Sequence, residues 1–252
     1  MSKSHALVQG ASRGIGLAFV RELLVDGERQ VIATCRDPKA ESANELAELS
    51  AKHSGRFRVV GLDVTDESSI VRAAQSLSEE VGGIDLLINS AGILHNGDGM
   101  RPERRLAEVK PEHVLECYRV NALGPLLMAK HFERYFLRRE RVVLANLSAR
   151  VGSIGDNRLG GWYAYRASKV AQNMMTRNLS IELRRRYRGV ICVALHPGTV
   201  DTELSRPFQN NVPSERLFTP QRAARQLLEV VGGLTLENNG GFFAWDGRAL
   251  PW

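Results

Sequence analysis

A glycine-rich turn near the amino terminus constrains the fold more than any other part of this sequence. The apolar run 6–8 is typical of a buried parallel strand, and it leads into a turn that carries Gly10, Gly14 and Gly16. Apolar residues at helical spacing follow over 17–24. A strand, a glycine turn and a helix in this order direct the helix N–H groups at a phosphate, and glycine lets the backbone approach it closely. The spacing is G-x-x-x-G-x-G rather than G-x-G-x-x-G, so a nucleotide site is favoured and an ordinary strand-to-helix turn remains the alternative.

Short apolar runs and amphipathic stretches alternate along the rest of the 252-residue chain. Strands are expected at 5–9, 30–35, 57–62, 84–89, 141–147, 189–195 and 241–245. Helices are expected at 14–27, 38–53, 66–82, 111–137, 162–187 and 219–231. Strands joined by helical crossovers predict an α/β fold: a Rossmann-type doubly wound sheet of about seven mostly parallel strands with helices on both faces. No linker or repeat interrupts this pattern, so residues 1–252 are expected to form a single domain.

The composition excludes several classes of protein. No apolar run is long enough to cross a membrane, the first strand begins too early for a signal peptide, and three cysteines are too few for a disulfide framework or a metal site. We therefore expect a cytoplasmic protein without a metal or a membrane partner. The net charge is +6, and arginines concentrate over 134–141 and 184–188, at the ends of expected helices. Because no nucleic-acid-binding motif accompanies them, they indicate solvated helix ends, and no nucleic-acid partner is expected.

The residues after the second expected strand bear on the choice of nucleotide. An acidic residue about 20 positions past the glycine turn would bind a ribose 2′-hydroxyl and select NAD. Arg36 stands at this place, and Arg13 lies in the turn itself. Two guanidinium groups suit a 2′-phosphate, so NADP(H) is expected to be the preferred cofactor. Asp37 keeps NAD(H) open, and two solvated surface arginines are the simpler alternative.

Polar residues follow the third and fourth expected strands. Asp63 either faces the nucleotide or caps the turn before Thr65. The segment 89–92, Asn-Ser-Ala-Gly, offers small residues beside a cofactor and an asparagine that can brace the sheet. Asn121 lies inside the long helix expected over 111–137. Pro125, four residues later, cannot donate to the Asn121 carbonyl, so a kink is expected there.

Tyr165 and Lys169 form the pattern from which a reaction can be inferred. Their spacing of four places the phenol and the ammonium side by side on one helix, whereas Tyr163 has no lysine at this spacing. A nearby ammonium favours the phenolate and lowers the pKa of the tyrosine. The phenol can then pass a proton to a carbonyl oxygen while hydride arrives at the carbon. Alone, the pattern more often means a half-buried aromatic side chain beside a surface lysine.

A serine at the end of the fifth expected strand completes this chemistry. Ser148 would hydrogen-bond the carbonyl oxygen and polarise it. Ser148 lies 17 positions before Tyr165, and Ser153 is a competitor for the same role. The position of Ser148 at the strand end favours it over Ser153.

Taken together, these segments resemble the short-chain dehydrogenase/reductase family over about 200 residues. The segments CRDP, GWYAYRASK, HPGTVDT and FFAWDGRALPW are similar to its C-factor-like, carbonyl-reductase-like branch. Gln9 departs from the family's threonine, which predicts that one side-chain contact is weakened. His196, at the end of the sixth expected strand, has no task in this chemistry and is expected to pack there.

The resemblance implies roles for individual residues. Asn121 would hold a water in a proton relay, Asp63 would contact adenine, and 199–219 would be a substrate lid. The residues that would hold the cofactor are Gly10, Ser12, Arg13, Gly14, Ile15, Gly16, Arg36, Asp63, Val64, Asn89, Ala91, Gly92, Tyr165, Lys169, Pro197, Gly198, Val200 and Thr202. An apolar or aromatic carbonyl compound would contact Leu94, Ile154, Trp162, Leu204 and Phe208, with simple core packing as the alternative. The helices at 111–137 and 162–187 would pair between subunits of a homodimer or homotetramer.

The sequence therefore predicts an NADPH-dependent oxidoreductase that reduces a small ketone or aldehyde, reversibly with the alcohol. Tyr165 would be the acid/base and Lys169 its activator and ribose anchor. Ser148 would polarise the carbonyl, and Asn121 would hold the relay. The alternative is an NADP(H)-binding signalling or sensor protein of the C-factor type with little or no turnover.

Overall fold

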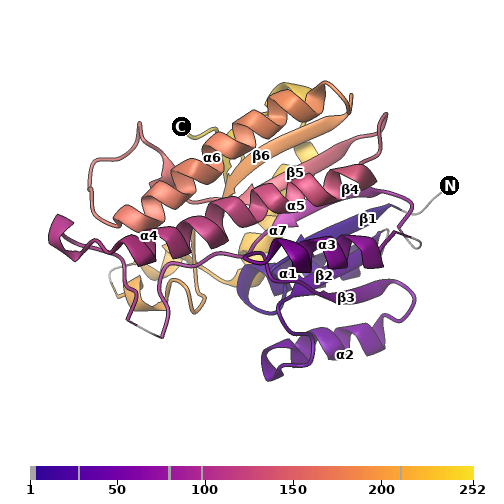
Figure 1. Ribbon diagram of the computed structural model, residues 1–252, viewed down its shortest axis with the longest axis horizontal. Helices are drawn as coiled ribbons and strands as arrows, with labels where there is room; N and C mark the ends of the chain where they lie inside the picture. The colour runs from indigo at the N-terminus through magenta and orange to yellow at the C-terminus, as the bar shows by residue number, and fades with distance from the viewer. Residues whose placement is uncertain (1–3, 28, 79–80, 98, 211) are drawn as a thin grey trace.

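Seven parallel strands form the central sheet, in the order β3-β2-β1-β4-β5-β6-β9 (Figure 1). The computed structural model describes residues 4–27, 29–78, 81–97, 99–210 and 212–252. The strands of the sheet are β1 His5–Gln9, β2 Gln30–Cys35, β3 Phe57–Gly61, β4 Ile84–Asn89, β5 Val142–Leu147, β6 Val190–His196 and β9 Phe242–Ala244. Every expected strand is confirmed with its ends within one residue, because each contains a short apolar stretch that a sheet covered on both faces can bury.

Helices cover both faces of this sheet, as expected. They are α1 Gly14–Asp26, α2 Asn44–Lys52, α3 Glu67–Ser76, α4 Pro111–Tyr118, α5 Gly124–Phe132, α6 Tyr163–Arg184 and α7 Pro220–Gly233. Strand side chains alternate between two cores. Ala6 and Val8 pack with α1, α2 and α7, whereas Leu7 packs with α3, α5 and α6.

Three expected helices differ from the structure in their bounds. The helix expected over 38–53 is α2 preceded by a 3₁₀ turn at Glu41–Ala43. The one expected over 66–82 ends at Ser76, and residues 79–80 of that range lie outside the described residues. The long helix expected over 111–137 is α4 and α5 joined by a π-helical turn at Arg119–Leu123. The sequence predicted a kink near Asn121, where Pro125 removes a backbone donor, and the structure has a π-helical turn at this place.

Two further strands were not expected. β7 Thr199–Val200 and β8 Leu217–Phe218 form a small parallel ladder inside the stretch 199–219, of which residue 211 lies outside the described residues. Two-residue strands have no periodicity to detect. The ladder joins the two ends of this stretch next to the carboxyl end of β6.

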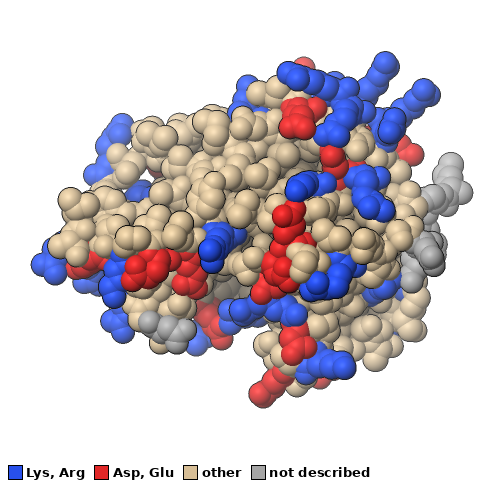
Figure 2. Space-filling view, in the orientation of Figure 1, with Lys and Arg blue, Asp and Glu red and all other residues tan. Residues whose placement is uncertain are grey.

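Lys and Arg side chains gather where α6 ends in Figure 2 and are scattered over the rest of this face, while much of the surface over α4 and α6 is uncharged. Arg186 in the second arginine run pairs with Glu133 and Glu182. These partners fit the interpretation as solvated helix ends. None of the helices within the described ranges has the length and apolar character to cross a bilayer.

Candidate active site

The glycine turn lies at the carboxyl edge of the sheet, beside the point where the strand order reverses. β1 pairs with both β2 and β4, and ligands of open α/β sheets bind at such a point. Gly10 has a φ of +78°, and a Cβ there would lie 2.6 Å from the Ala91 nitrogen. A Cβ on Gly16 would collide with the Gly10 carbonyl oxygen. The first turn of α1 has no side-chain cap and no acidic residue, so its N–H groups are suited to a phosphate.

The segment after β6 closes against this turn. The Thr202 methyl lies 3.3 Å from the place that a Cβ on Gly14 would take. Arg13 forms an ion pair with Glu203, and His95 Nε2 lies 3.1 Å from the Glu203 carbonyl oxygen. The start of the stretch 199–219 is thereby held across the amino end of α1.

Gln9 makes a contact that the sequence did not predict. Its Oε1 accepts a hydrogen bond of 3.2 Å from the Ala91 N–H, so it ties β1 to the segment that follows β4. The predicted loss of the threonine's contact stays a prediction, and the glutamine makes a contact of its own because its longer side chain reaches the Ala91 N–H.

The two candidate phosphate-binding arginines differ in their surroundings. Both side chains are exposed, and Arg13 is engaged by Glu203. Arg36 forms no ion pair with any described residue. The carboxylate of Asp37, which kept NAD open, accepts a hydrogen bond of 2.8 Å from the Lys39 N–H. Of the two arginines, Arg36 at the end of β2 is therefore the one whose guanidinium is not paired with a carboxylate of the described residues.

Asp63 and Asn89 have structural partners. Asp63 Oδ1 accepts hydrogen bonds from the Thr65 N–H at 2.8 Å and from the Thr65 hydroxyl at 2.7 Å, which confirms the turn-capping alternative. Asn89 Nδ2 donates to Asn146 Oδ1 at 2.8 Å, and Asn146 donates in turn to Thr176 on α6. Asn89 therefore braces β4 against β5, as expected. The other predicted cofactor residues at this edge are Ser12, Ile15, Val64, Pro197, Gly198 and Val200.

Tyr165 and Lys169 lie together in the first turns of α6. Both are buried, and Lys169 Nζ lies 5.8 Å from the centroid of the Tyr165 ring. Tyr163, by contrast, is exposed. Lys169 Nζ donates to the Leu147 carbonyl oxygen at 2.7 Å and to Gln172 Oε1 at 3.1 Å. The Tyr165 hydroxyl makes no hydrogen bond to any residue in the described part of the chain.

The pKa values of this pair run against the expectation from the sequence. Burial raises the pKa of the Tyr165 phenol above its ordinary value, and the neighbouring Cys117 thiol adds to the effect. Burial lowers the pKa of Lys169 to about 7. The expectation that the pKa of Tyr165 is lowered is therefore wrong, because burial is the largest influence on this phenol and it disfavours the charged form. Lys169 titrates instead near neutral pH.

Asn121 lies in the π-helical turn and clamps the segment that follows β4. Its Oδ1 accepts from the Ile93 N–H at 2.7 Å, and its Nδ2 donates to the Ile93 carbonyl oxygen at 2.8 Å and to Ser168 Oγ at 2.9 Å. A Cβ on Gly92 would lie 3.4 Å from Asn121 Oδ1 and 3.9 Å from Lys169 Nζ. Both polar atoms of the Asn121 side chain are therefore engaged in holding the segment after β4 and Ser168 of α6.

The hydroxyl proton of each candidate serine is already donated to an acceptor within the protein. The Ser148 hydroxyl donates to Asn173 Oδ1 at 2.7 Å, while Asn173 Nδ2 donates to the Gly152 carbonyl oxygen at 3.0 Å. Ser153 Oγ donates to the Trp252 carbonyl oxygen at 3.3 Å and accepts from the Asp156 N–H. Both serines are buried. To polarise a carbonyl, Ser148 has to turn away from Asn173.

Aromatic rings line the approach to Tyr165. The Trp162 ring centroid lies 6.3 Å from that of Tyr165 and 4.9 Å from that of Phe208 in the stretch 199–219. Leu204 Cδ1 lies 3.9 Å from the place of a Cβ on Gly92. Four of the five predicted substrate residues are thus buried or half-buried, including Leu94, whereas Ile154 is 70% exposed.

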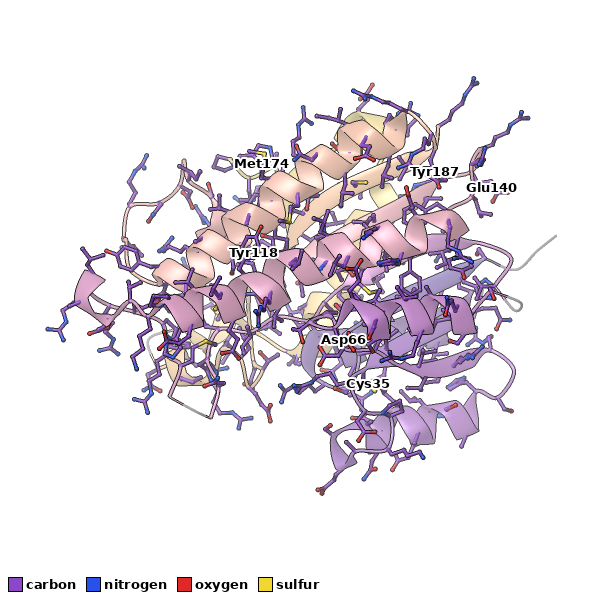
Figure 3. The ribbon with its side chains drawn as sticks, in the orientation of Figure 1. Cys35, Asp66, Tyr118, Glu140, Met174 and Tyr187 are labelled. Carbon is purple, nitrogen blue, oxygen red and sulfur yellow. The ribbon has the colours of Figure 1, made fainter. Side chains whose placement is uncertain are left out.

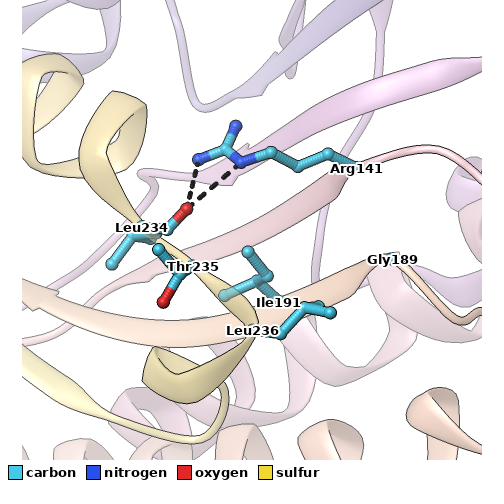
Figure 4. A pocket seen from close by; sticks show the side chains of 6 residues that line it. All are labelled: Arg141, Gly189, Ile191, Leu234, Thr235 and Leu236. Carbon is cyan, nitrogen blue, oxygen red and sulfur yellow. Dashed lines mark hydrogen bonds between the residues drawn. The ribbon is translucent and has the colours of Figure 1, made fainter.

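A hollow of about 400 Å³ at the opposite edge of the sheet has a different role (Figure 4). Its charged group is Arg141, whose Nε and Nη2 donate to the Leu234 carbonyl oxygen at 3.3 and 3.2 Å. This guanidinium also donates to the Val231 carbonyl, so it satisfies the end of α7. The hollow therefore belongs to the structural scaffold. No group of three or more histidine, cysteine or acidic side chains suited to a metal occurs within the described ranges.

A family model described as short chain dehydrogenase matches residues 4–213. The chain belongs to the short-chain dehydrogenase family. An NADPH-bound carbonyl reductase from chicken fatty liver superposes on this short-chain dehydrogenase with a TM-score of 0.88 at 35% identity, over 100% of this chain and 99% of that one.

Two curated relatives extend the comparison. An uncharacterised oxidoreductase of Schizosaccharomyces pombe is 33% identical over 97% of this chain and 96% of its own length. The C-signal of Myxococcus xanthus is 35% identical over 68% of this chain and 94% of its own length. The family expected from the sequence is confirmed.

One residue of the site in this short-chain dehydrogenase was not predicted. Glu103 is only 2% exposed, and its Oε2 accepts from the Ala164 N–H at 3.3 Å at the start of α6. The Glu103 carbonyl oxygen accepts from the Trp162 N–H at 2.6 Å. Trp162 has a φ of +52°, a left-handed conformation that non-glycine residues rarely adopt. Glu103 therefore holds Trp162 and the first turn of α6. Nothing in the sequence signals this role, because Glu103 is one of several charged residues in a polar loop.

Proposed function

We propose that this short-chain dehydrogenase is an NADPH-dependent reductase of ketones or aldehydes that runs reversibly with the alcohol. The observation that carries the proposal is the Tyr165 hydroxyl, which has no partner among the described residues and lies one helical turn from the Lys169 amine. The Tyr165 ring is buried, but its hydroxyl oxygen is not among the buried polar atoms without a partner, so it is open to an incoming oxygen.

The crevice fits a nicotinamide dinucleotide. The close approach at Gly10 leaves no room for a side chain, and the uncapped N–H groups of α1 suit the pyrophosphate. Arg36 is exposed and without an ion-pair partner among the described residues, whereas Asp37 is engaged in its own turn. These two facts support binding of a 2′-phosphate by Arg36. Arg13 would leave its ion pair with Glu203 to contact the same phosphate. The cofactor is then NADP(H) rather than NAD(H).

Each side chain has one role in the proposed reaction. A bound nicotinamide supplies the hydride. Tyr165 donates its proton to the carbonyl oxygen, and the Lys169 ammonium stabilises the phenolate that remains. The Asn121 carbonyl, whose α-helical donor is missing at Pro125, holds a water from which the proton is replaced. Ser148 turns its hydroxyl from Asn173 to the carbonyl oxygen.

The walls of the approach favour an apolar or aromatic carbonyl compound. Trp162 and Phe208 supply ring faces, and Leu204 supplies an aliphatic side chain above Gly92. The stretch 199–219 acts as the lid, since it carries Leu204 and Phe208 and is joined to α1 through Arg13 and Glu203.

This protein self-associates through α4 and α6. Tyr118 on α4 and Met174 on α6 are both exposed and are labelled on the same face in Figure 3. Leu115 and Ile181 are further exposed apolar side chains of these helices. Such an apolar patch with few charged neighbours is typical of a subunit interface. The location in the cytoplasm stays a prediction.

A signalling function is the second candidate, and the identity of 35% with the C-signal favours it. The two functions differ in turnover. Fluorescence titration with NADPH and NADH comes first, followed by NADPH oxidation with a panel of aliphatic and aromatic ketones and aldehydes.

We expect NADPH to bind at least about tenfold more tightly than NADH, and an aromatic carbonyl to be turned over. Arg36→Ala should remove the preference, while Lys39→Ala, a nearby exposed cation, should keep it. Tight NADPH binding without turnover of any carbonyl would contradict the reductase and favour the signalling protein.

A further inference from the structure

Gln172 lies beside the Lys169 amine and has no role in the chemistry described so far. It follows Lys169 by three residues on α6, and it is only 1% exposed. Its Oε1 accepts the hydrogen bond of 3.1 Å from Lys169 Nζ. Its Nε2 is buried and has no hydrogen-bond partner among the described residues.

The orientation of this amide follows from chemistry. An ammonium has three donors and no acceptor, so only the oxygen of the amide can face it. The NH₂ group must then point into the protein, where it finds no acceptor. A buried donor without a partner is unfavourable, so a side chain of this kind at a functional site calls for a compensating role.

The surroundings of Lys169 indicate that role. Its second acceptor is the Leu147 carbonyl, and it forms no salt bridge within the described residues. The titratable groups that face it are the Tyr165 phenol on its own helix and the Cys117 thiol from α4, with the buried Glu103 carboxylate beyond Cys117. The ammonium is therefore held by two neutral oxygens, and Gln172 is the side chain that supplies one of them.

We propose that Gln172 is a positioning residue that keeps the Lys169 side chain in its ammonium form and leaves its third hydrogen for Tyr165 and the ligand. The proposal rests on the proposed function, in which Lys169 acts as a cation. Burial disfavours the ammonium and the Cys117 thiol favours it. The hydrogen bond to the Gln172 oxygen acts in the same direction as Cys117, so losing it should lower the pH at which Lys169 loses its charge.

Nuclear magnetic resonance of lysine labelled at Cε tests this directly, because the chain has only six lysines. In the wild-type protein the Lys169 signal should titrate near pH 7. Gln172→Leu removes the acceptor and should lower the midpoint by about one pH unit, a tenfold change in the protonation equilibrium. Gln172→Glu places a carboxylate at the same point and should raise the midpoint.

Thr176→Val is the matched control. Thr176 is buried one turn further along α6 and its hydroxyl donates to the Gln172 carbonyl oxygen, but it does not touch Lys169. This variant should leave the Lys169 midpoint unchanged. Equal midpoints for Gln172→Leu, Gln172→Glu and the wild type would overturn the proposal, as would an equal shift in all three variants.

The pH dependence of kcat/KM gives the second measurement. Its alkaline limb should move with the Lys169 midpoint in both Gln172 variants. If no carbonyl is turned over, the proposed function fails while the lysine titration still decides the role of Gln172. If turnover is found and its alkaline limb does not follow the titration, the role of Gln172 in positioning Lys169 for the reaction is contradicted.

Discussion

Ser148 on the end of β5 and Asn173 on α6 are joined by a hydrogen bond of 2.7 Å in which the serine is the donor. The direction is fixed because the Asn173 amide nitrogen donates to the Gly152 carbonyl, which leaves its oxygen for Ser148. Any hydrogen bond from Ser148 to a substrate must replace this one. Ser148 therefore braces β5 against α6. In the proposed reaction it would gain only the difference between a hydrogen bond to the substrate and this one.

The first prediction concerns this exchange. Ser148→Ala should lower kcat/KM by about tenfold, less than the ~10²–10³ typical when an uncommitted oxyanion donor is removed. It should also lower the free energy of unfolding by about 1–2 kcal/mol, because Asn173 loses its donor. Ser153→Ala should leave kcat/KM within about threefold of the wild type. A larger loss of kcat/KM for Ser153→Ala than for Ser148→Ala would assign the polarising role to Ser153.

Most of the fold could be predicted from the sequence, and particular residues show which features could not. The strands β1, β2 and β4 have the expected bounds because each contains a short apolar stretch, and Pro125 indicated that the helix is interrupted near Asn121. The direction of the Ser148 side chain could not be predicted, because in an extended chain a shift of one residue reverses the face. It is decided by Asn173, which lies 25 positions away.

Glu103 and Gln9 illustrate the second limit. Each gains its role from a contact across the fold, with Ala164 and Ala91 respectively. A single sequence contains no local signal for such pairs, because an acidic residue in a polar loop is usually solvated. Tyr165 and Lys169 were predictable because one turn of helix joins them.

The second prediction concerns Glu103. Glu103→Leu removes the acceptor for the Ala164 N–H and should lower the free energy of unfolding by about 1–2 kcal/mol, as loss of a helix cap does. Because Trp162 loses its support, KM for an aromatic carbonyl should rise several-fold while NADPH affinity stays unchanged. Glu112→Ala, an exposed acidic residue on α4, is the control and should change neither quantity. Wild-type stability of Glu103→Leu in thermal and denaturant unfolding would refute the capping role.

The third prediction concerns pH. Burial, together with the charge of Arg150, lowers the pKa of His196 from its ordinary 6.5 to about 4. Between these values the unfolded chain takes up a proton that the folded chain does not, so the free energy of unfolding falls as the pH drops from 6.5 to 4. The contribution of His196 to this loss is about 3 kcal/mol. His196→Gln should show a correspondingly flatter profile in urea unfolding, whereas His113→Gln on α4 should follow the wild type; identical profiles for all three proteins would contradict the assignment.

The fourth prediction concerns self-association. Met174 is 62% exposed on α6, and Met174→Glu would bury a charge if this face meets a second subunit. Sedimentation velocity should show a dimer or tetramer for the wild type, and the substitution should raise its dissociation constant by at least about 100-fold. Val25→Glu, on the exposed side of α1, should leave the oligomer intact. A wild-type protein that sediments as a monomer would remove the proposed interface.

The most direct test of the account is the turnover of Tyr165→Phe on a carbonyl that the wild type reduces, with NADPH affinity measured on the same sample. The variant keeps the buried ring and loses only the hydroxyl that has no partner in the described structure. Tyr163→Phe, which removes an exposed phenol two residues earlier, is the matched control. We predict that Tyr165→Phe lowers kcat by about 10³-fold with unchanged NADPH affinity, and that Tyr163→Phe retains wild-type turnover. Turnover of Tyr165→Phe close to that of the wild type would contradict proton transfer by Tyr165 and with it the proposed mechanism.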